Sequence, residues 1–162
     1  MRHRQSIILL TMFLTIYAPF VLAQTIEHGP DSGHEATHDI HPNFLALFVG
    51  ITDEGRREAI TLGIEYERRM NETFGIGLVV EHAFGDLDFW VYAVPFAYHT
   101  GRWKFFVAPG VEDGDHGSEA LVRIGGEYAF EFSGWEISPQ FDVDFVDGEE
   151  VFVLGVAFGK GF

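Results

Sequence analysis

The last twelve residues of the chain, 151–162 (VFVLGVAFGKGF), alternate large apolar side chains with small ones. Side chains alternate faces along a strand, so this segment has one bulky apolar face and one nearly bare face. The bulky face carries Phe152, Leu154, Val156 and Phe158. A strand of a soluble sheet usually carries polar residues opposite its apolar face. The pattern therefore predicts a strand in the wall of a narrow closed barrel, with the small side chains inside.

The same period of two runs back to Asn43 and is broken by turn residues at near-regular intervals. It divides into eight runs, at residues 43–52, 57–68, 73–82, 88–98, 103–112, 119–131, 135–146 and 151–162. Each run is about as long as a tilted strand needs to be to cross a bilayer. The sequence thus predicts an all-β fold, an eight-stranded antiparallel up-and-down transmembrane β-barrel formed by residues 43–162.

Four turns allow the predicted strands to be checked against each other, because paired residues must face the same side. The pairs expected are Asp144 with Val151 across Asp147-Gly148, Arg123 with Asp144 and Gly125 with Asp142 across Ser133-Gly134, Ala97 with Lys104 across Thr100-Gly101, and Gly50 with Ala59 across Glu54-Gly55. All four turns keep the same inside and outside, and this agreement supports the barrel more strongly than any single strand does.

The main alternative is a soluble eight-stranded barrel of the lipocalin kind, which shares the strand number and the alternation. Its bulky face would surround a ligand and its Gly- and Ala-rich face would meet water. Water-facing surfaces normally carry mixed charge, so that surface would be unusual. The pattern favours the transmembrane barrel, with the bulky face toward lipid.

The first 42 residues precede the strand pattern. Residues 1–23 have a basic start (Arg2, Arg4), an apolar stretch and a small residue at the end, which is typical of a cleaved signal peptide. Residues 24–42 are polar and rich in His, Asp and Gly, and we expect a disordered, flexible leader in the periplasm. The chain has no cysteine, and its net charge of −15 excludes nucleic acid as a partner.

An even number of strands places both termini on the periplasmic side, so the other set of turns becomes short, acidic outer loops. The inner face carries several ionisable residues. Arg123 is expected near Asp144 and Asp142, and Glu81, Glu127 and Glu65 belong to the same interior. Buried charges must be paired, which predicts a salt-bridged network that plugs the barrel. The excess of carboxylates over Arg123 and Lys104 leaves open a second hypothesis, a narrow leak for cations or protons or a small-solute transport barrel.

Metal binding is a third hypothesis. The leader contains His28, His34, His38 and His41, and neutral imidazoles bind Zn²⁺, Cu²⁺ or Ni²⁺. The acidic outer loops would suit Ca²⁺ or Mg²⁺, although no segment has the spacing of a calcium loop. No other cofactor is expected. We also expect no enzymatic activity. His82 is predicted to face outward at the outer end of its strand, and Ser118 and His116 fall in a neighbouring loop. No His-x-Ser pairing lies on one strand face, as a nucleophile and its base would need.

The barrel segment resembles the small OmpA/OmpX-type outer-membrane barrels in strand count, length, export signal and terminal Phe162. Short segments at 62–67 (LGIEYE), 107–112 (VAPGVE) and 144–150 (DFVDGEE) also resemble other bacterial barrel proteins. The resemblance implies a location in the outer membrane of a Gram-negative envelope, in contact with outer-membrane lipid and lipopolysaccharide, and we expect a monomer. It further implies that Phe162 is the signal read by the barrel-assembly machinery. The outer loops are shorter than those that such proteins often use for adhesion.

Overall fold

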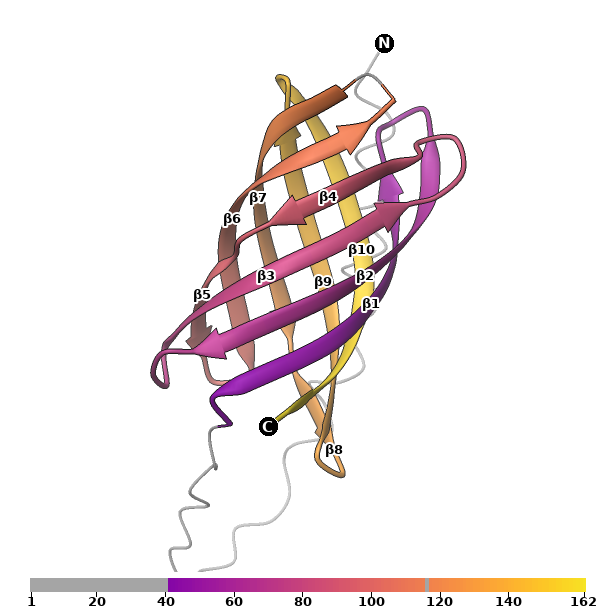
Figure 1. Ribbon diagram of the computed structural model, residues 1–162. Coiled ribbons are helices and arrows are strands. Elements are labelled where there is room, and N and C mark those ends of the chain that lie inside the picture. Colours follow the sequence, from indigo (N-terminus) through magenta and orange to yellow (C-terminus); the bar gives the residue numbers. More distant parts are fainter. Residues whose placement is uncertain (1–40, 116) are drawn as a thin grey trace, which may run out of the picture. The chain divides into compact units, whose positions relative to one another are not determined.

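The structure is a computed structural model that describes residues 41–115 and 117–162. Ten strands follow one another along these residues (Figure 1). They are β1 (Asn43–Asp53), β2 (Glu58–Arg69), β3 (Phe74–Ala83), β4 (Phe89–Ala93), β5 (Phe96–Thr100), β6 (Trp103–Gly114), β7 (Gly117–Tyr128), β8 (Phe130–Phe132), β9 (Trp135–Val146) and β10 (Glu149–Gly161). Among these residues there is no helix long and apolar enough to span a membrane.

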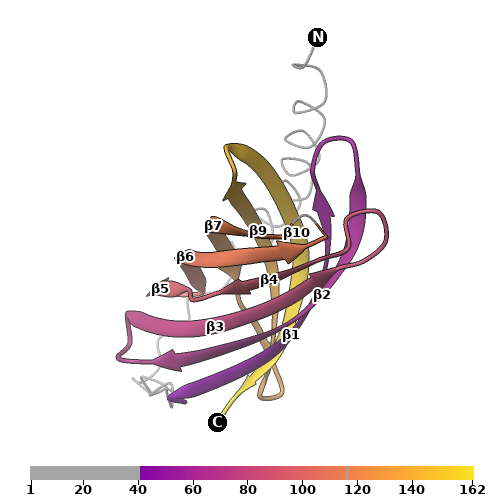
Figure 2. The ribbon, with the colours of Figure 1, turned by 45° about the horizontal axis from the view of Figure 1, so that its top comes forward.

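The strands form one antiparallel sheet that closes on itself, because β10 pairs with β1 as well as with β9 (Figures 1 and 2). Two of the eight strand positions in the barrel wall are each occupied by two shorter strands in succession. β4 and β5 are separated at Val94-Pro95, where proline has no N–H to donate to the ladder. β7 and β8 are separated at Ala129. The predicted eight-stranded antiparallel barrel is confirmed.

Two of the four predicted turns have the expected register. Asp147-Gly148 and Ser133-Gly134 have positive φ at both positions, as type I′ turns require. They pair Asp144 with Val151, Arg123 with Asp144 and Gly125 with Asp142, as predicted.

The other two predicted registers are wrong by two residues. Ala59 pairs with Thr52 rather than Gly50, because the hairpin has a four-residue loop at 54–57 instead of a two-residue turn. Lys104 pairs with His99 rather than Ala97, because the turn lies at Gly101-Arg102, with a φ of 60° at Gly101. Strand side chains repeat every two residues, so a shift of two leaves every side chain on its predicted face.

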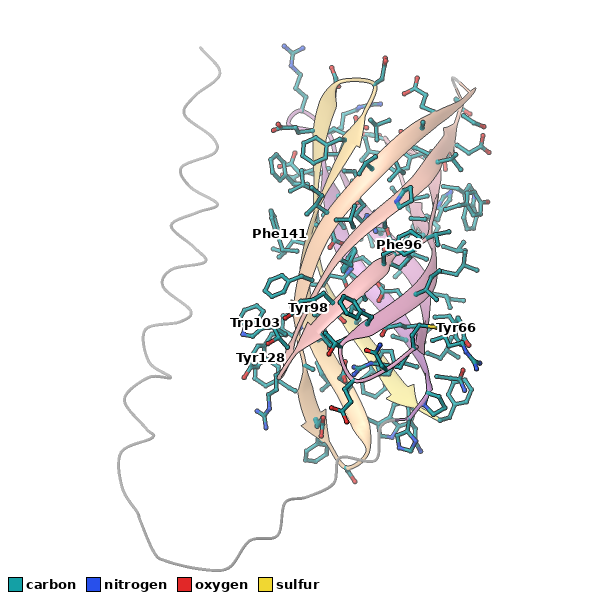
Figure 3. The ribbon with its side chains drawn as sticks, turned by 90° about the vertical axis from the view of Figure 1, so that its left-hand side faces the viewer. Tyr66, Phe96, Tyr98, Trp103, Tyr128 and Phe141 are labelled. Atoms are coloured by element: carbon teal, nitrogen blue, oxygen red, sulfur yellow. The ribbon has the colours of Figure 1, made fainter. Side chains whose placement is uncertain are left out.

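The bulky apolar side chains cover the outside of the barrel (Figure 3). Leu47, near the middle of β1, is 62% exposed, while its neighbours Ala46 and Phe48 are buried. Every strand from β1 to β7 repeats this alternation. The lipocalin-like alternative placed the bulky face inside and is therefore wrong.

The two ends of the barrel differ. We call the end that holds the first residue of β1 and the last residue of β10 the terminal end, and the opposite end the loop end. At the terminal end Asn43 donates its backbone N–H to the carbonyl of Phe162 (3.2 Å) and accepts that residue's N–H (2.8 Å). The Tyr66 hydroxyl donates to the Asn43 side chain at 2.9 Å. These bonds fasten the last residue to the first strand.

Candidate functional site

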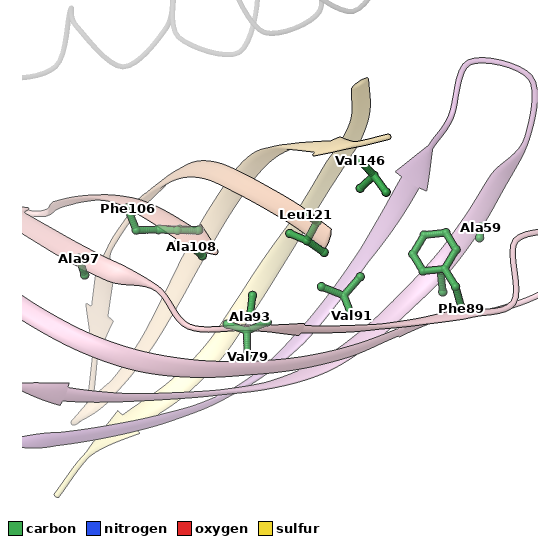
Figure 4. Close-up of a cluster of buried hydrophobic side chains, with 11 residues drawn as sticks. Ala59, Val79, Phe89, Val91, Ala93, Ala97, Phe106, Ala108, Leu121 and Val146 are labelled. Atoms are coloured by element: carbon green, nitrogen blue, oxygen red, sulfur yellow. The ribbon is translucent and has the colours of Figure 1, made fainter. Parts of the chain in front are cut away.

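The polar interior of the barrel is the candidate site, and the strand register sets its order. From the loop end to the terminal end, β7 turns Leu121, Arg123, Gly125 and Glu127 inward. Their register partners on β6 and β9 make successive levels of the lumen: Gly110 and Val146, Ala108 and Asp144, Phe106 and Asp142, and Lys104 and Gln140. The level nearest the loop end is apolar, and Val91, Leu121 and Val146 lie in the buried cluster that Figure 4 shows.

The second level is an ion-pair network around Arg123, which is 1% exposed. Its Nε and Nη2 donate to the two carboxylate oxygens of Asp144 at 2.6 and 2.8 Å, a bidentate pair. Its Nη1 lies 2.7 Å from Glu81 and 3.7 Å from Asp142. The Gln140 side-chain amide donates to Asp142 at 2.8 Å. Strands β3, β7 and β9 are thus linked across the lumen.

A second network lies closer to the terminal end. Lys104 Nζ is 2.5 Å from Glu127 and 3.4 Å from Glu67. Glu67 also contacts His99 Nε2 at 2.6 Å and Arg69 Nε at 3.3 Å. This network joins strands β2, β5, β6 and β7.

Four of the six residues predicted for the lumen network, Arg123, Asp144, Asp142 and Glu81, meet in the first network. Glu127 belongs instead to the second, with Lys104. Glu65 is buried, and its Oε1 has no hydrogen-bond partner among the described residues. Glu67 and His99 were missed by the sequence reasoning. Both lie two residues from an inward-facing position, Glu65 and Ala97, so the alternation itself would have found them.

Carboxylates outnumber cations in the buried interior. Six of them are buried: Glu65, Glu67, Glu81, Glu127, Asp142 and Asp144. Arg123 is buried with them, and the Lys104 side chain is 12% exposed. Within the described part of the chain, one oxygen each of Glu65, Glu127 and Asp142 and both oxygens of Glu81 lack a hydrogen-bond partner, although Glu81 Oε2 forms the ion pair with Arg123. The interior is therefore an acidic environment around two fixed cations.

Long side chains occupy the space beside the interior glycines. A Cβ added to Gly125 would collide with Asp142 Oδ1 and the Phe106 ring, and one added to Gly155 with the Phe48 ring. A cavity of about 10 Å³ lies between Glu65, Val79, Pro95, Lys104 and Phe106, room for roughly one water molecule. The glycines of the inner face thus make room for phenylalanine rings and carboxylates.

Replacing Gly125 by alanine should therefore overpack the lumen and lower the free energy of unfolding by about 1–3 kcal/mol. The matched control is Gly126→Ala on the outer face of the same strand, where the nearest atom is Phe105 Cδ1 at 3.3 Å. Urea unfolding in detergent micelles measures both. Equal losses for the two variants would contradict the close packing inside.

The histidines of the metal hypothesis, and the His and Ser residues weighed for catalysis, lie elsewhere. His28, His34 and His38 are outside the described residues, as is His116, and His41 packs against Gly161. His82 faces outward between Phe84 and Trp90, and its Nε2 is 3.4 Å from Asp88. Ser118 donates to Asp113. Within residues 41–115 and 117–162, no group of three or more His, Asp or Glu is arranged to hold a metal ion.

Aromatic side chains gather on the outer surface toward the terminal end. Trp103 stacks on Phe105 and meets Tyr128 edge-on, and Trp135 stacks on Phe158 (Figure 3 labels Trp103 and Tyr128). Lys160 lies 5.7 Å from the Trp135 ring centre. Trp and Tyr prefer the level of lipid headgroups. The arrangement is that of an interfacial aromatic girdle.

No known protein family and no curated protein matches the sequence. Several solved structures are similar in fold. The N-terminal β-barrel domain of Pseudomonas aeruginosa OprF is 13% identical, with 76% of this chain and 100% of that chain covered and a TM-score of 0.53. Ail, the attachment invasion locus protein of Yersinia pestis, is 14% identical, with 74% of this chain and 96% of that chain covered and a TM-score of 0.50. A de novo designed transmembrane β-barrel is 10% identical, with 74% of this chain and 97% of that chain covered and a TM-score of 0.52. The fold is that of the small OmpA/OmpX-type barrels.

Proposed function

We propose that this chain is a structural, non-enzymatic β-barrel of the bacterial outer membrane, with a lumen closed by buried ion pairs. The observation that carries the proposal is the Arg123 network, which crosses the lumen from β7 to β9 and β3. The apolar level on its loop-end side and the Lys104 network on its terminal-end side add two further barriers. Eight-stranded barrels enclose an interior just wide enough for side chains to fill.

Several features support the outer-membrane location. The wall presents large apolar side chains outward on every side, and closed barrels and helices are the structures that satisfy all backbone groups in lipid. Ail, one of the similar natural barrels, is an outer membrane protein of Yersinia pestis, and residues 1–23 have the pattern of an export signal. With both strand termini at the terminal end, that end would face the periplasm and the loop end the outside.

The non-enzymatic role is supported by how the candidate catalytic side chains are engaged. Ser118 is bonded to Asp113, and His82 faces outward beside Asp88. A serine nucleophile needs its base within hydrogen-bond reach, and among the described residues the contact that Ser118 makes is with Asp113 rather than with a histidine.

Electrical recording in planar bilayers tests the plug. The wild-type barrel should give no measurable ion current, because the two networks and the phenylalanines occupy the lumen. The double variant Arg123→Ala, Lys104→Ala removes both cations, and where it folds it should conduct cations through the carboxylate-lined interior. Flotation with lipid vesicles confirms insertion of each protein. Steady current from inserted wild-type protein would overturn the plug.

The carboxylate excess favours a second candidate, a narrow leak for cations or protons. Six buried carboxylates around Arg123 and Lys104 would attract cations and repel anions. This candidate predicts a small, cation-selective wild-type current that is reduced by neutralising Glu65, whose Oε1 lacks a partner among the described residues. Pyranine-loaded vesicles would detect protons that a bilayer recording misses.

A further inference from the structure

The lipid-facing surface contains a groove of about 380 Å³ near the terminal end of β3 and β5. Its sides are Phe74 and Ile76 from β3, Phe96 and Tyr98 from β5, and Met70 from the turn after β2. All five side chains are exposed. Figure 3 labels Phe96 and Tyr98 on the outside of the barrel. The volume lies in the roughly 300–1,000 Å³ range of sites that bind small molecules.

Backbone chemistry explains why the wall is hollowed there. The floor of the groove is formed by the backbone of Gly75 and Ala97, a register pair whose side-chain positions face the lumen, where Ala97 is buried and a Cβ on Gly75 would meet Glu67. Just toward the loop end, the hydrogen-bond ladder is interrupted on both sides of the strand position that β4 and β5 share. Gly77 donates to the carbonyl of Pro95 and Val94 donates to that of Pro109, but neither proline can return a hydrogen bond. Strand β5 therefore forms a separate short strand, with Phe96 at its start.

A free cation stands at the edge of the groove. Arg68 on β2 is the register partner of Ile76, and its side chain is exposed on the same outer face. The described residues offer it no ion pair, in contrast to Arg69 with Glu67 and Arg57 with Glu54. Tyr98, on the far side, carries a hydroxyl in the aromatic girdle. An apolar trough beside a guanidinium that has no ion pair among the described residues matches the acyl chain and the phosphate of a phospholipid.

We propose that this groove binds one anionic phospholipid, with an acyl chain between the Ile76–Phe96 pair and the Phe74–Tyr98 pair and the phosphate on Arg68. The assignment rests on the proposed membrane location, where acyl chains surround the groove and headgroups lie at the level of the girdle. Arginine binds phosphate through two parallel charge-assisted hydrogen bonds. Binding of a phosphate to Arg68 is therefore favoured over hydration of its guanidinium. A net negative headgroup matches the positive charge of Arg68, which no described residue pairs.

Native mass spectrometry of the full barrel, released from detergent with phosphatidylglycerol or phosphatidylcholine, tests the proposal. Wild-type protein should retain one phosphatidylglycerol and bind phosphatidylcholine more weakly. Arg68→Gln should weaken phosphatidylglycerol binding about tenfold, the loss expected for one charged hydrogen-bonded contact. Ile76→Trp, which fills the groove, should weaken both lipids. Lys160→Gln removes an equivalent rim charge at Trp135 and should change neither.

Equal phosphatidylglycerol binding by wild type and Arg68→Gln would overturn the site, as would a dimer in place of the lipid adduct. Flotation of the same preparations with vesicles separates this failure from failure of the proposed location. Protein that floats but shows no dependence on Arg68 disproves the groove alone. Protein that does not float disproves the membrane location and the groove with it.

Discussion

Replacing Arg123 by alanine is expected to lower the free energy of unfolding of the barrel by about 3–5 kcal/mol. The guanidinium is the shared partner of Asp144 and Glu81, and Asp142 lies 3.7 Å away. Without the guanidinium, the first network has no cation and its three carboxylates remain buried. Burying these uncompensated charges costs far more free energy than the loss of their attraction to Arg123. Urea titration of the protein in detergent micelles, followed by tryptophan fluorescence, measures the change.

The control for this loss is Arg57→Ala. Arg57 pairs with Glu54 in an exposed loop, and such pairs contribute about 0–1 kcal/mol. Arg123→Lys is a second comparison, because lysine keeps the charge but cannot form the bidentate contact with Asp144, so an intermediate loss is expected. A loss for Arg123→Ala no larger than that for Arg57→Ala would show that the network does not hold the interior together.

Replacing Leu47 by arginine should cost about 2–4 kcal/mol when the barrel is folded in a bilayer. Leu47 lies near the middle of β1 with its side chain on the outer face, opposite Ile64 and Phe158. If that face meets hydrocarbon, the guanidinium must lie near the centre of the membrane. Reversible unfolding from phospholipid vesicles by guanidinium chloride measures the cost.

Depth provides the control. Ile60→Arg changes an equally exposed residue of β2 near the loop end, where the cost should fall to about 0–1 kcal/mol. A flat response, with both variants as stable as the wild type, would mean that the bulky face meets water. The depth dependence thus separates a membrane barrel from any soluble one, irrespective of what fills the lumen.

Most of the fold could be predicted from the sequence because alternation along a strand is a local property. A face is fixed by whether a residue is odd or even in its strand, so Leu47 and Arg123 could be placed outside and inside without any knowledge of register. The Asp147-Gly148 and Ser133-Gly134 turns also fixed register, because Gly with Asp or Ser readily adopts the positive φ of a type I′ turn.

The errors arose where chain geometry departs from local preference. The hairpin after β1 uses a four-residue loop, in which Glu54 donates its backbone N–H to the carbonyl of Arg57 and pairs its carboxylate with the Arg57 guanidinium. Proline at position 95 separates β4 from β5, where the alternation in the sequence alone predicts one continuous strand. The partners of Glu127 and Glu67 depend on which residues meet across the lumen, and that follows from closure and strand tilt rather than from any one strand. The groove beside Arg68 likewise exists only once β3 and β5 are paired.

Tryptophan quenching by brominated phospholipids tests the central claim, that the large apolar side chains touch lipid. Trp90, Trp103 and Trp135 are all exposed on the outer face. Barrels folded in vesicles that carry bromine on the acyl chains should lose most of their tryptophan fluorescence, while a water-soluble quencher should have little effect. Fluorescence that persists with brominated lipid and falls with the aqueous quencher, from protein that stays a compact monomer in plain buffer, would contradict it.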